Sequence, residues 1–397
     1  MCAVKRSSRT LQVRGRRVFV RVDANVPLHG ERIRDDTRVR AIAPTLADLR
    51  ARGGRLVVAS HLGRPKGQVD PTLSLARVAE RLSELLGCVV ALAPDSVGPA
   101  VEARARRLAD GDVLLLENLR FHPGEEQNDP SHAAALARLA EVYVNDAFGT
   151  AHRAHASTVG VARLLPAAAG PLMHAEIQAL DRATRDPDRP FVAVLGGAKV
   201  SDKIGVLRRL ATQVDALLLG GGLANTFMAN AGGALGRSLV EPGQAETVAA
   251  VRAAAAASGC RILLPKDAVV ATAIDPNGAT TVVPADQVPD DQMALDIGPA
   301  ATMAYLEVLA EARTVVWNGP LGVYECKPFA QGTLAVAHGL ATSAAFVVVA
   351  GGDALAAAQA AGVADRMGHL STGGGATLEF LEGRDLPGLA ALPDARA

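Results

Sequence analysis

The stretch that decides the fold reads Phe191-Val-Ala-Val-Leu-Gly-Gly-Ala-Lys-Val-Ser-Asp-Lys-Ile-Gly-Val-Leu-Arg-Arg-Leu-Ala211. The apolar run at 191–195 predicts a strand that is buried on both faces. A glycine-rich turn follows, and the apolar residues of 202–211 recur at helical spacing. A buried strand, a turn and an amphipathic helix form one unit of an α/β fold with a parallel sheet.

The same alternation continues along the chain on both sides of this stretch. Strands are predicted at 17–23, 55–60, 113–117, 141–146, 191–195, 216–219, 261–264, 314–317 and 346–350. Helices are predicted between them at 37–52, 73–86, 131–140, 202–211 and 244–257. Residues 275–290 are rich in Pro, Asp and Gly, which predicts a loop excursion or a small hairpin.

A chain of 397 residues is too long for one ordinary core and predicts two domains. We expect two Rossmann-like domains, each a parallel sheet flanked by helices, facing each other across a hinged cleft. The predicted divisions are an N-terminal domain at 1–171, a connector helix at 172–184, a C-terminal domain at 185–380 and a tail at 381–397. The tail is apolar, so we expect it to pack back on the body, against the N-terminal domain.

Composition excludes several classes of function. Lys+Arg and Asp+Glu number 41 each, so no global field attracts nucleic acid or an anionic membrane. The basic start runs on without an apolar segment, and no other tract predicts a membrane span, so we expect a soluble, cytoplasmic protein. The four cysteines are isolated, as is typical of reduced thiols.

The residues that follow the strands carry the chemistry, because ligands of parallel sheets bind at the carboxyl ends of the strands. In the first half, forked donors and polar groups follow four predicted strands. They are Asp23, Asn25, His61, Arg64, Arg120 and Arg153. Arginine and histidine side chains in such a cup are suited to a small, heavily anionic ligand.

The second half has glycines at the corresponding places. Its strands are followed by Gly196-Gly197, Gly220-Gly221-Gly222, Asn318-Gly319 and Gly351-Gly352-Asp353, and Gly373-Gly374-Gly375 joins them. Glycine lets backbone N–H groups approach phosphate closely, and Asp353 adds a carboxylate suited to Mg²⁺. The chain lacks both a P-loop and a complete G-x-G-x-x-G sequence, so the predicted nucleotide site is of another kind.

Two lysines stand out because only six of the 41 basic residues are lysine. Lys199 and Lys203 lie four residues apart at the start of a predicted helix, so they can share one face. Compact ammonium groups there suit a phosphoryl group in transfer. Two ligands on two domains indicate group transfer, with domain closure to exclude water.

These motifs together resemble those of the phosphoglycerate kinase family along nearly the whole chain. They are Arg21-Val-Asp-Ala-Asn-Val-Pro27, Ser60-His-Leu-Gly-Arg-Pro65, Glu117-Asn-Leu-Arg120, Gly149-Thr-Ala-His-Arg-Ala-His155, Gly196-Gly-Ala-Lys-Val-Ser-Asp-Lys-Ile204, Asp296-Ile-Gly-Pro299, Trp317-Asn-Gly-Pro320, Gly351-Gly-Asp353 and Ser371-Thr-Gly-Gly-Gly375. The resemblance implies reversible, Mg²⁺-dependent phosphoryl transfer from 1,3-bisphosphoglycerate to ADP, giving 3-phosphoglycerate and ATP.

The resemblance also implies roles for the residues of the N-terminal domain, which would bind 3-phosphoglycerate. Asp23 and Asn25 would hold its hydroxyl and carboxyl end. The non-reacting phosphate would be bound by His61, Arg64, Arg120 and Arg153. Arg38, on the helix after the first strand, would be a catalytic residue that reaches the transferring phosphoryl group.

The C-terminal domain would bind the nucleotide. Lys203 would bind its phosphates and the group in transfer, Lys199 would move in on closure, and the N–H groups of Gly373, Gly374 and Gly375 would cap the phosphoryl oxygens. Asp353 would hold Mg²⁺, Glu325 the ribose and Asn318 the phosphate chain. The other nucleotide contacts implied are Gly196, Gly220, Gly221, Ala294, Gly351, Gly352 and Ala354.

Three residues depart from the family pattern: Ala24 for Phe, Ala294 for Gly and Ala354 for Thr or Ser. The last two bear on nucleotide affinity and not on the reaction. Two other classes stay open at this point. One is a metal-dependent hydrolase built on His61, His152, His155, Asp23 and Asp146, and the other is a non-catalytic nucleotide-binding protein. Nothing in the sequence calls for a dimer, so we expect a monomer.

Overall fold

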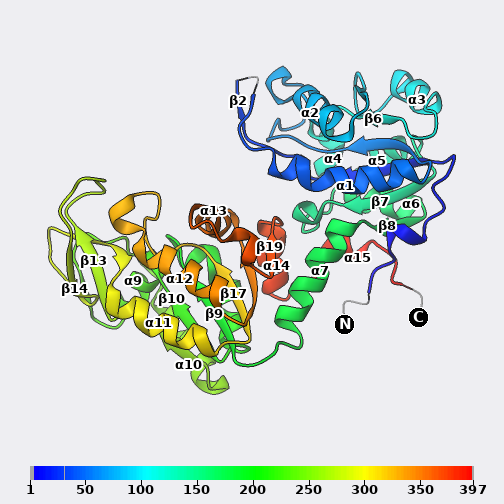
Figure 1. Ribbon diagram of the computed structural model, residues 1–397. Helices are drawn as coiled ribbons and strands as arrows, with labels where there is room; N and C mark the ends of the chain where they lie inside the picture. Colours follow the sequence, from blue (N-terminus) through cyan, green and yellow to red (C-terminus); the bar gives the residue numbers. More distant parts are fainter. Residues whose placement is uncertain (1–3, 31, 396–397) are drawn as a thin grey trace. The chain divides into compact units, whose positions relative to one another are not determined.

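The computed structural model describes residues 4–30 and 32–395, and the contacts divide the chain into two units (Figure 1). The first unit contains the residues up to Ile177 together with those from Asp385 onward. The second unit is Gln178–Arg384. The division therefore falls inside helix α7 (Pro171–Thr184), and residues 381–384 of the expected tail belong to the second unit.

The first unit is built on a six-stranded parallel sheet. Its strands, in spatial order, are β5 (Val90–Leu92), β6 (Val113–Leu115), β4 (Arg55–Ala59), β1 (Arg17–Val22), β7 (Val142–Asp146) and β8 (Ala167–Ala169). Alternate residues of β1, such as Val18 and Val20, share one buried cluster with Leu46 of α1 (Thr37–Ala51) and Leu82 of α2 (Ala76–Leu86). The remaining longer helices of this unit are α3 (Pro99–Arg106) and α5 (Pro130–Ala137).

The second unit repeats this plan. Its parallel sheet runs β12 (Arg261–Leu263), β10 (Ala216–Leu219), β9 (Phe191–Leu195), β17 (Thr314–Asn318), β18 (Phe346–Ala350) and β19 (His369–Ser371). Its longer helices are α8 (Ile204–Ala211), α9 (Gly221–Ala229), α10 (Ala245–Ser258), α11 (Pro299–Glu311), α12 (Gln331–Thr342) and α13 (Gly352–Ala360). Trp317 lies fully buried in the cluster shared with Tyr305 and Val336, as expected for a core residue.

These sheets confirm the predicted α/β class, and each of the nine predicted strands is present. Three short strands of the large sheets were not predicted: β5, β8 and β19. Within 275–290 lies β14 (Thr281–Pro284), which pairs antiparallel with β13 (Asp267–Ala271). Because β16 (Met293–Ile297) pairs with β13 on its other side, the feature is a three-stranded sheet and larger than a hairpin.

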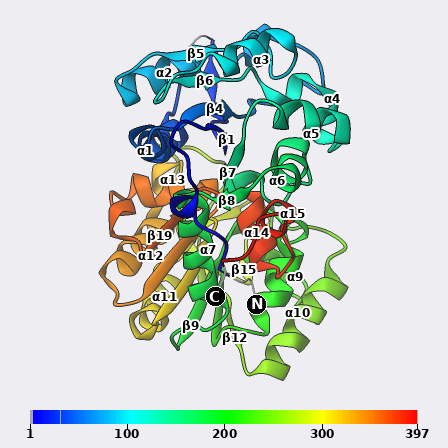
Figure 2. The same ribbon diagram turned by 90° about the vertical axis from the view of Figure 1, so that its right-hand side faces the viewer.

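The last described residues pack on the first unit (Figure 2). Leu389 of α15 (Pro387–Ala390) and Leu392 are buried, and the Gly388 N–H donates to the Ala151 carbonyl over 2.8 Å. Lys5 Nζ donates to the Leu392 carbonyl over 3.1 Å and lies 2.7 Å from Asp394 Oδ1. Residues near the two ends of the described chain therefore bond to each other.

None of the helices in the described part of the chain has the length and apolarity needed to cross a bilayer.

Candidate active site

The polar residues of the first unit follow the strands of its parallel sheet. Asp23 and Asn25 come directly after β1, and His61 comes after β4. Arg120 lies in a short 3-10 turn, Leu119–Phe121, beyond β6, and Arg153 lies beyond β7. Since all these strands are parallel, their carboxyl ends meet at one edge, and the fold delivers these side chains to one place.

Arg38 closes one side of this edge. Its Nη1 lies 3.3 Å from Asp23 Oδ2 and donates to the Asn25 carbonyl over 3.0 Å. Asn25 Oδ1 in turn accepts from the Gly63 N–H over 2.9 Å, which joins the loops after β1 and β4. A pocket lined by Asn25, Val26, Pro27, Asp35 and Arg38 opens here.

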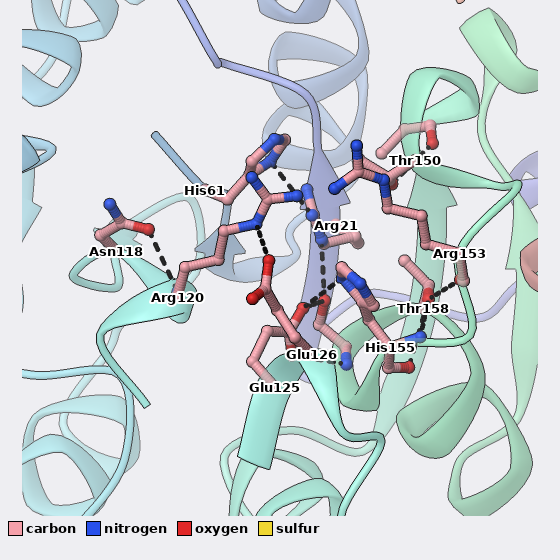
Figure 3. A network of polar contacts seen from close by, with 12 residues as sticks. Arg21, His61, Asn118, Arg120, Glu125, Glu126, Thr150, Arg153, His155 and Thr158 are labelled. Carbon is pink, nitrogen blue, oxygen red and sulfur yellow. Dashed lines mark hydrogen bonds and ion pairs between the residues drawn. The ribbon is translucent and has the colours of Figure 1, made fainter. Parts of the chain in front are cut away.

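His61, Arg120 and Arg153 gather around the buried Arg21 (Figure 3). Arg21 Nη2 lies 3.3 Å from His61 Nδ1. Arg120 Nη1 donates to the Gly63 carbonyl over 2.7 Å, and its Nε lies 3.1 Å from Glu126 Oε1. Arg120 keeps only 3% of its surface exposed, so the protein fixes its guanidinium rather than leaving it in solvent.

The electrostatics show how closely the charges converge. Burial lowers the pKa of His61 well below its ordinary value, and the positive charges of Arg21, Arg120, Arg153 and Arg38 lower it further. Burial lowers the pKa of Arg120 to about 10, with Arg153 adding to the effect. Four guanidinium groups around a neutral imidazole form a site that a multiply charged anion would stabilise.

One predicted member stands apart from this group. Arg64 follows Gly63 (φ +60°) and is exposed, and its charge is not among the largest influences on the pKa of His61. The structure thus brings together the other predicted residues of the first unit and leaves Arg64 at the surface.

Lys203 is the centre of the predicted site in the second unit. Its Nζ donates to the Asn318 carbonyl over 3.0 Å and to Asn318 Oδ1. Asn318 Nδ2 donates to the Ala350 carbonyl over 2.7 Å, which links the ends of β17 and β18. Burial lowers the pKa of Lys203 to about 8, opposed by the negative charges of Asp353 and Asp202.

The glycines around Lys203 allow close approach of the backbone. A Cβ on Gly196 would overlap the Pro320 carbonyl, and a Cβ on Gly220 would overlap the Leu321 side chain. Gly351 has a φ of +87°, and a Cβ there would lie 2.7 Å from Asn318 Nδ2. Gly221 (φ +63°) opens α9.

Asp353 and its neighbours begin helix α13. The space beside Gly352 is open, Asp353 is exposed in the first turn, and Ala354 is fully buried. One exposed carboxylate leaves room for phosphate oxygens and water, which is the ligand set that Mg²⁺ prefers. The residues present therefore fit this ion.

The remaining predicted nucleotide residues are more dispersed. Lys199 and Glu325 are exposed, and Lys199 contributes to lowering the pKa of Glu241. Ala294 is half-buried and lines an apolar pocket with Gly221 and Leu321.

Gly373, Gly374 and Gly375 connect β19 to α14 (Gly375–Leu381). Gly374 has a φ of +55°, and the Gly373 N–H donates to Ser371 Oγ over 3.3 Å. That N–H is engaged within the loop.

Three buried residues beneath the first site have no role predicted from the sequence: Arg21, Glu125 and Ser157. A charged residue in the apolar strand of β1 was the available signal for Arg21. Glu125 lies in a short helix after the Arg120 turn, where no periodicity distinguishes a buried carboxylate from an exposed one.

Comparison with known proteins agrees with this geometry. The sequence pattern of the phosphoglycerate kinase family matches residues 8–384. The phosphoglycerate kinase of Thermomicrobium roseum is 57% identical over 387 residues, covering 98% of this chain and 99% of its own. That of Moorella thermoacetica is 55% identical over 390 residues, with the same coverage.

Solved structures show the same fold. The phosphoglycerate kinase of Coxiella burnetii superposes with a TM-score of 0.90 at 40% identity, covering 98% of both chains. That of Pyrococcus horikoshii OT3 has a TM-score of 0.83 at 34% identity, covering 97% of this chain and 98% of its own. Fold and sequence together define a phosphotransferase. The chain belongs to the phosphoglycerate kinase family.

Proposed function

We propose that this protein transfers the acyl phosphate of 1,3-bisphosphoglycerate reversibly to ADP, giving 3-phosphoglycerate and ATP in glycolysis. Family membership over residues 8–384 supports the reaction. The observation that carries the assignment of the substrate site is the convergence of four guanidinium charges on His61 in the first unit.

The first unit binds the phosphoglycerate in this proposal. Asp23 and Asn25 hold the hydroxyl and carboxyl end, and His61, Arg120 and Arg153 bind the phosphate that does not react. Arg64, which is exposed in the free protein, turns inward to the same phosphate when the ligand is present. Arg38 lies against Asp23 and reaches the transferring phosphoryl group from there.

The second unit binds the nucleotide. Lys203 and Asn318 hold the phosphates, Glu325 the ribose, and the N–H groups of Gly374 and Gly375 cap the oxygens of the phosphoryl group, with Gly373 supporting the loop. Lys199 joins on closure. Mg²⁺, held by Asp353 when bound, neutralises phosphate charge.

The glycines described above form the proposed binding surface for the nucleotide. Its proposed members are Gly196, Gly220, Gly221, Gly351 and Gly352, with Ala354 supplying its backbone N–H and Ala294 lying beside the base. Glycine at these places keeps side chains out of the path of the phosphates.

The reaction needs positioning and positive charge, and it needs neither a protein nucleophile nor a general base. The attacking group in the ATP-consuming direction is a substrate carboxylate, which is already ionised. A neutral His61 therefore serves as a ligand. The charge that develops on the equatorial oxygens is stabilised by the Arg38 guanidinium and the Lys203 ammonium.

The assay that tests the function follows ATP-dependent phosphorylation of 3-phosphoglycerate, with product formation coupled to NADH oxidation. We expect turnover of tens per second or more, which Lys203→Ala reduces by orders of magnitude. Lys266→Ala, a lysine outside the proposed site, is the matched control and keeps its activity. Nucleotide binding without turnover in the wild type would favour a non-catalytic protein.

A metal-dependent hydrolase finds no support. Among residues 4–30 and 32–395, no group of three His, Cys, Asp or Glu side chains is placed to hold a metal ion. The guanidinium groups beside His61 would repel a dication.

Closure of the two domains on their ligands is part of this proposal, with α7 as the hinge. Small-angle scattering checks it: the radius of gyration is expected to be smaller with both substrates than with either one. An unchanged radius contradicts the hinge.

We further propose a cytoplasmic monomer. Sedimentation equilibrium checks the oligomeric state, since a single species of 40.8 kDa is expected.

A further inference from the structure

A buried network lies beneath the phosphate site and is not part of the functions proposed above. It consists of Arg21, Ser157 and Glu125, each with no exposed surface (Figure 3 shows Arg21 and Glu125). Ser157 Oγ lies 2.6 Å from Glu125 Oε1, and the Ser157 N–H donates to Glu125 Oε2 over 2.9 Å. Ser157 therefore binds both oxygens of the Glu125 carboxylate.

The chemistry of the donors gives this network a direction. Arg21 Nε donates to Ser157 Oγ over 2.9 Å, because a guanidinium has only donors. Burial raises the pKa of Glu125, and the charge of Arg21 and the two hydrogen bonds from Ser157 oppose that shift and favour the ionised form. With Glu125 ionised, the Ser157 hydroxyl accepts from Arg21 and gives its own hydrogen to Glu125. One hydroxyl links the positive charge of Arg21 to the negative charge of Glu125, which compensates a guanidinium that is otherwise buried at high cost.

The polar contacts continue from Arg21 to His61. Arg21 Nη2 lies 3.3 Å from His61 Nδ1, and the guanidinium is again the donor. His61 Nδ1 must then be an acceptor without a proton. Burial and the surrounding guanidinium groups lower the pKa of His61 well below its ordinary value, so the ring is neutral and carries its proton on Nε2.

We propose that Glu125 is a positioning residue: through Ser157 and Arg21 it holds His61 as a neutral ring with its proton on Nε2, ready to donate to a phosphate oxygen. The inference rests on the proposed function for the identity of that phosphate. Arg120 and Arg153 supply charge in this site, and His61 supplies one donor of fixed direction.

The serine in the middle explains why the carboxylate acts at a distance. A carboxylate bonded directly to Arg21 would draw its guanidinium away from His61. With Ser157 between them, Glu125 engages Arg21 only through Nε, and Nη2 stays directed at His61.

Two variants break the network without adding bulk. Glu125→Gln places an amide donor against Ser157 Oγ, which then has competing donors from both sides. Ser157→Ala removes the link and leaves the carboxylate. Glu80→Gln is the matched control, since Glu80 is exposed on α2 and pairs with Arg77.

The first readout is the ¹⁵N spectrum of the imidazole rings in the substrate-free protein, with His61 assigned by its loss in His61→Gln. We expect the wild type and Glu80→Gln to show a neutral ring protonated on Nε2. In Glu125→Gln and Ser157→Ala we expect Nδ1 to carry a proton in part of the population.

The second readout is kinetic. In both network variants, KM for 3-phosphoglycerate is expected to rise about tenfold, the size of one charge-assisted hydrogen bond, with KM for ATP within twofold of the wild type. If circular dichroism shows that Glu125→Gln does not fold, the spectrum and the KM values of Ser157→Ala test the proposal.

Three results would overturn the proposal: a wild-type His61 protonated on Nδ1, a His61 spectrum that is unchanged in the folded variants, or equal rises in both KM values. The spectra need no turnover. A wild type that fails to phosphorylate 3-phosphoglycerate therefore contradicts the proposed function and leaves the spectroscopic result to be judged separately.

Discussion

Arg38 is held by two residues of the proposed substrate site. Its side chain is about a third exposed and contacts Asp23 and the Asn25 carbonyl, and both Arg38 and Asn25 line the pocket there. A cation held by partial contacts can exchange them for a new anion at low cost, because it keeps much of its hydration until then.

Replacing this side chain separates binding from catalysis. We expect Arg38→Ala to lower kcat by about two to three orders of magnitude with little change in KM, because the main contact forms in the transition state. Steady-state kinetics measure both constants. Arg40→Ala is the control, because Arg40 is the next arginine along α1 and is exposed. An unchanged kcat in Arg38→Ala would contradict the proposed role.

Lys203 gives a pH dependence whose sign follows from its burial. Its pKa is about 8 in the folded protein and 10.5 ordinarily, so between these values the unfolded chain binds more protons. The free energy of unfolding contributed by this group therefore rises with pH across that window, by roughly 3 kcal/mol in total, and the destabilisation is complete below pH 8.

Urea unfolding of the wild type and Lys203→Met between pH 7 and 10.5 isolates this effect, since methionine does not titrate. The free energy of unfolding of Lys203→Met minus that of the wild type is expected to be greatest at pH 7 and to shrink as pH rises. A difference that stays constant with pH contradicts the assignment.

At the scale of single residues, the sequence predicted which polar side chains follow the strands of one sheet. It did not predict the buried residues beneath them. Asp23, His61 and Arg120 follow predicted strands, and the parallel sheet brings them together. The location of Arg64 at the surface and the burial of Glu125 depend on how loops fold back, and no local pattern encodes that.

The chain segments that follow the neighbouring strands β9 and β17 lie too close together to admit a side chain on Gly196. The Gly196 N–H donates to the Asn318 carbonyl over 3.0 Å, and the Pro320 carbonyl occupies the position that a Cβ on Gly196 would take. Both backbones must move apart to admit a methyl group.

We expect Gly196→Ala to destabilise the second unit by about 1–3 kcal/mol or more, as overpacking against rigid backbone does. Gly352→Ala is the control, because nothing lies within 4 Å of the added carbon. Chemical denaturation compares the two, and equal stability would show that the loops yield freely.

At the scale of elements, prediction succeeded where hydrophobic runs were long. Strands such as Phe191–Leu195 and Phe346–Ala350 are apolar throughout, as buried parallel strands are. The missed strand β8 reads Ala-Ala-Ala, a composition that favours a helix and becomes a strand only by pairing with β7.

At the scale of the whole chain, the first unit is completed by residues far along the sequence. Leu386, Leu389 and Leu392 are buried in it, each with 3% or less of its surface exposed. Their side chains belong to its core as much as those of the strands do.

Leu392→Ala is expected to lower the stability of the first unit by about 2–5 kcal/mol, the cost of truncating a buried leucine. Hydrogen exchange resolved along the chain should show faster exchange in β7 and β8, with β9 and β10 little changed. Leu164→Ala, at an exposed leucine, is the control, and equal exchange in both variants would contradict the role of the tail.

This placement of the tail also sets an order of events during synthesis. The second unit, Gln178–Arg384, is continuous, whereas the first needs residues that leave the ribosome after residue 384. The domain that is translated first is therefore the one that finishes last, and until then a nascent chain exposes an apolar surface to the cell's chaperones.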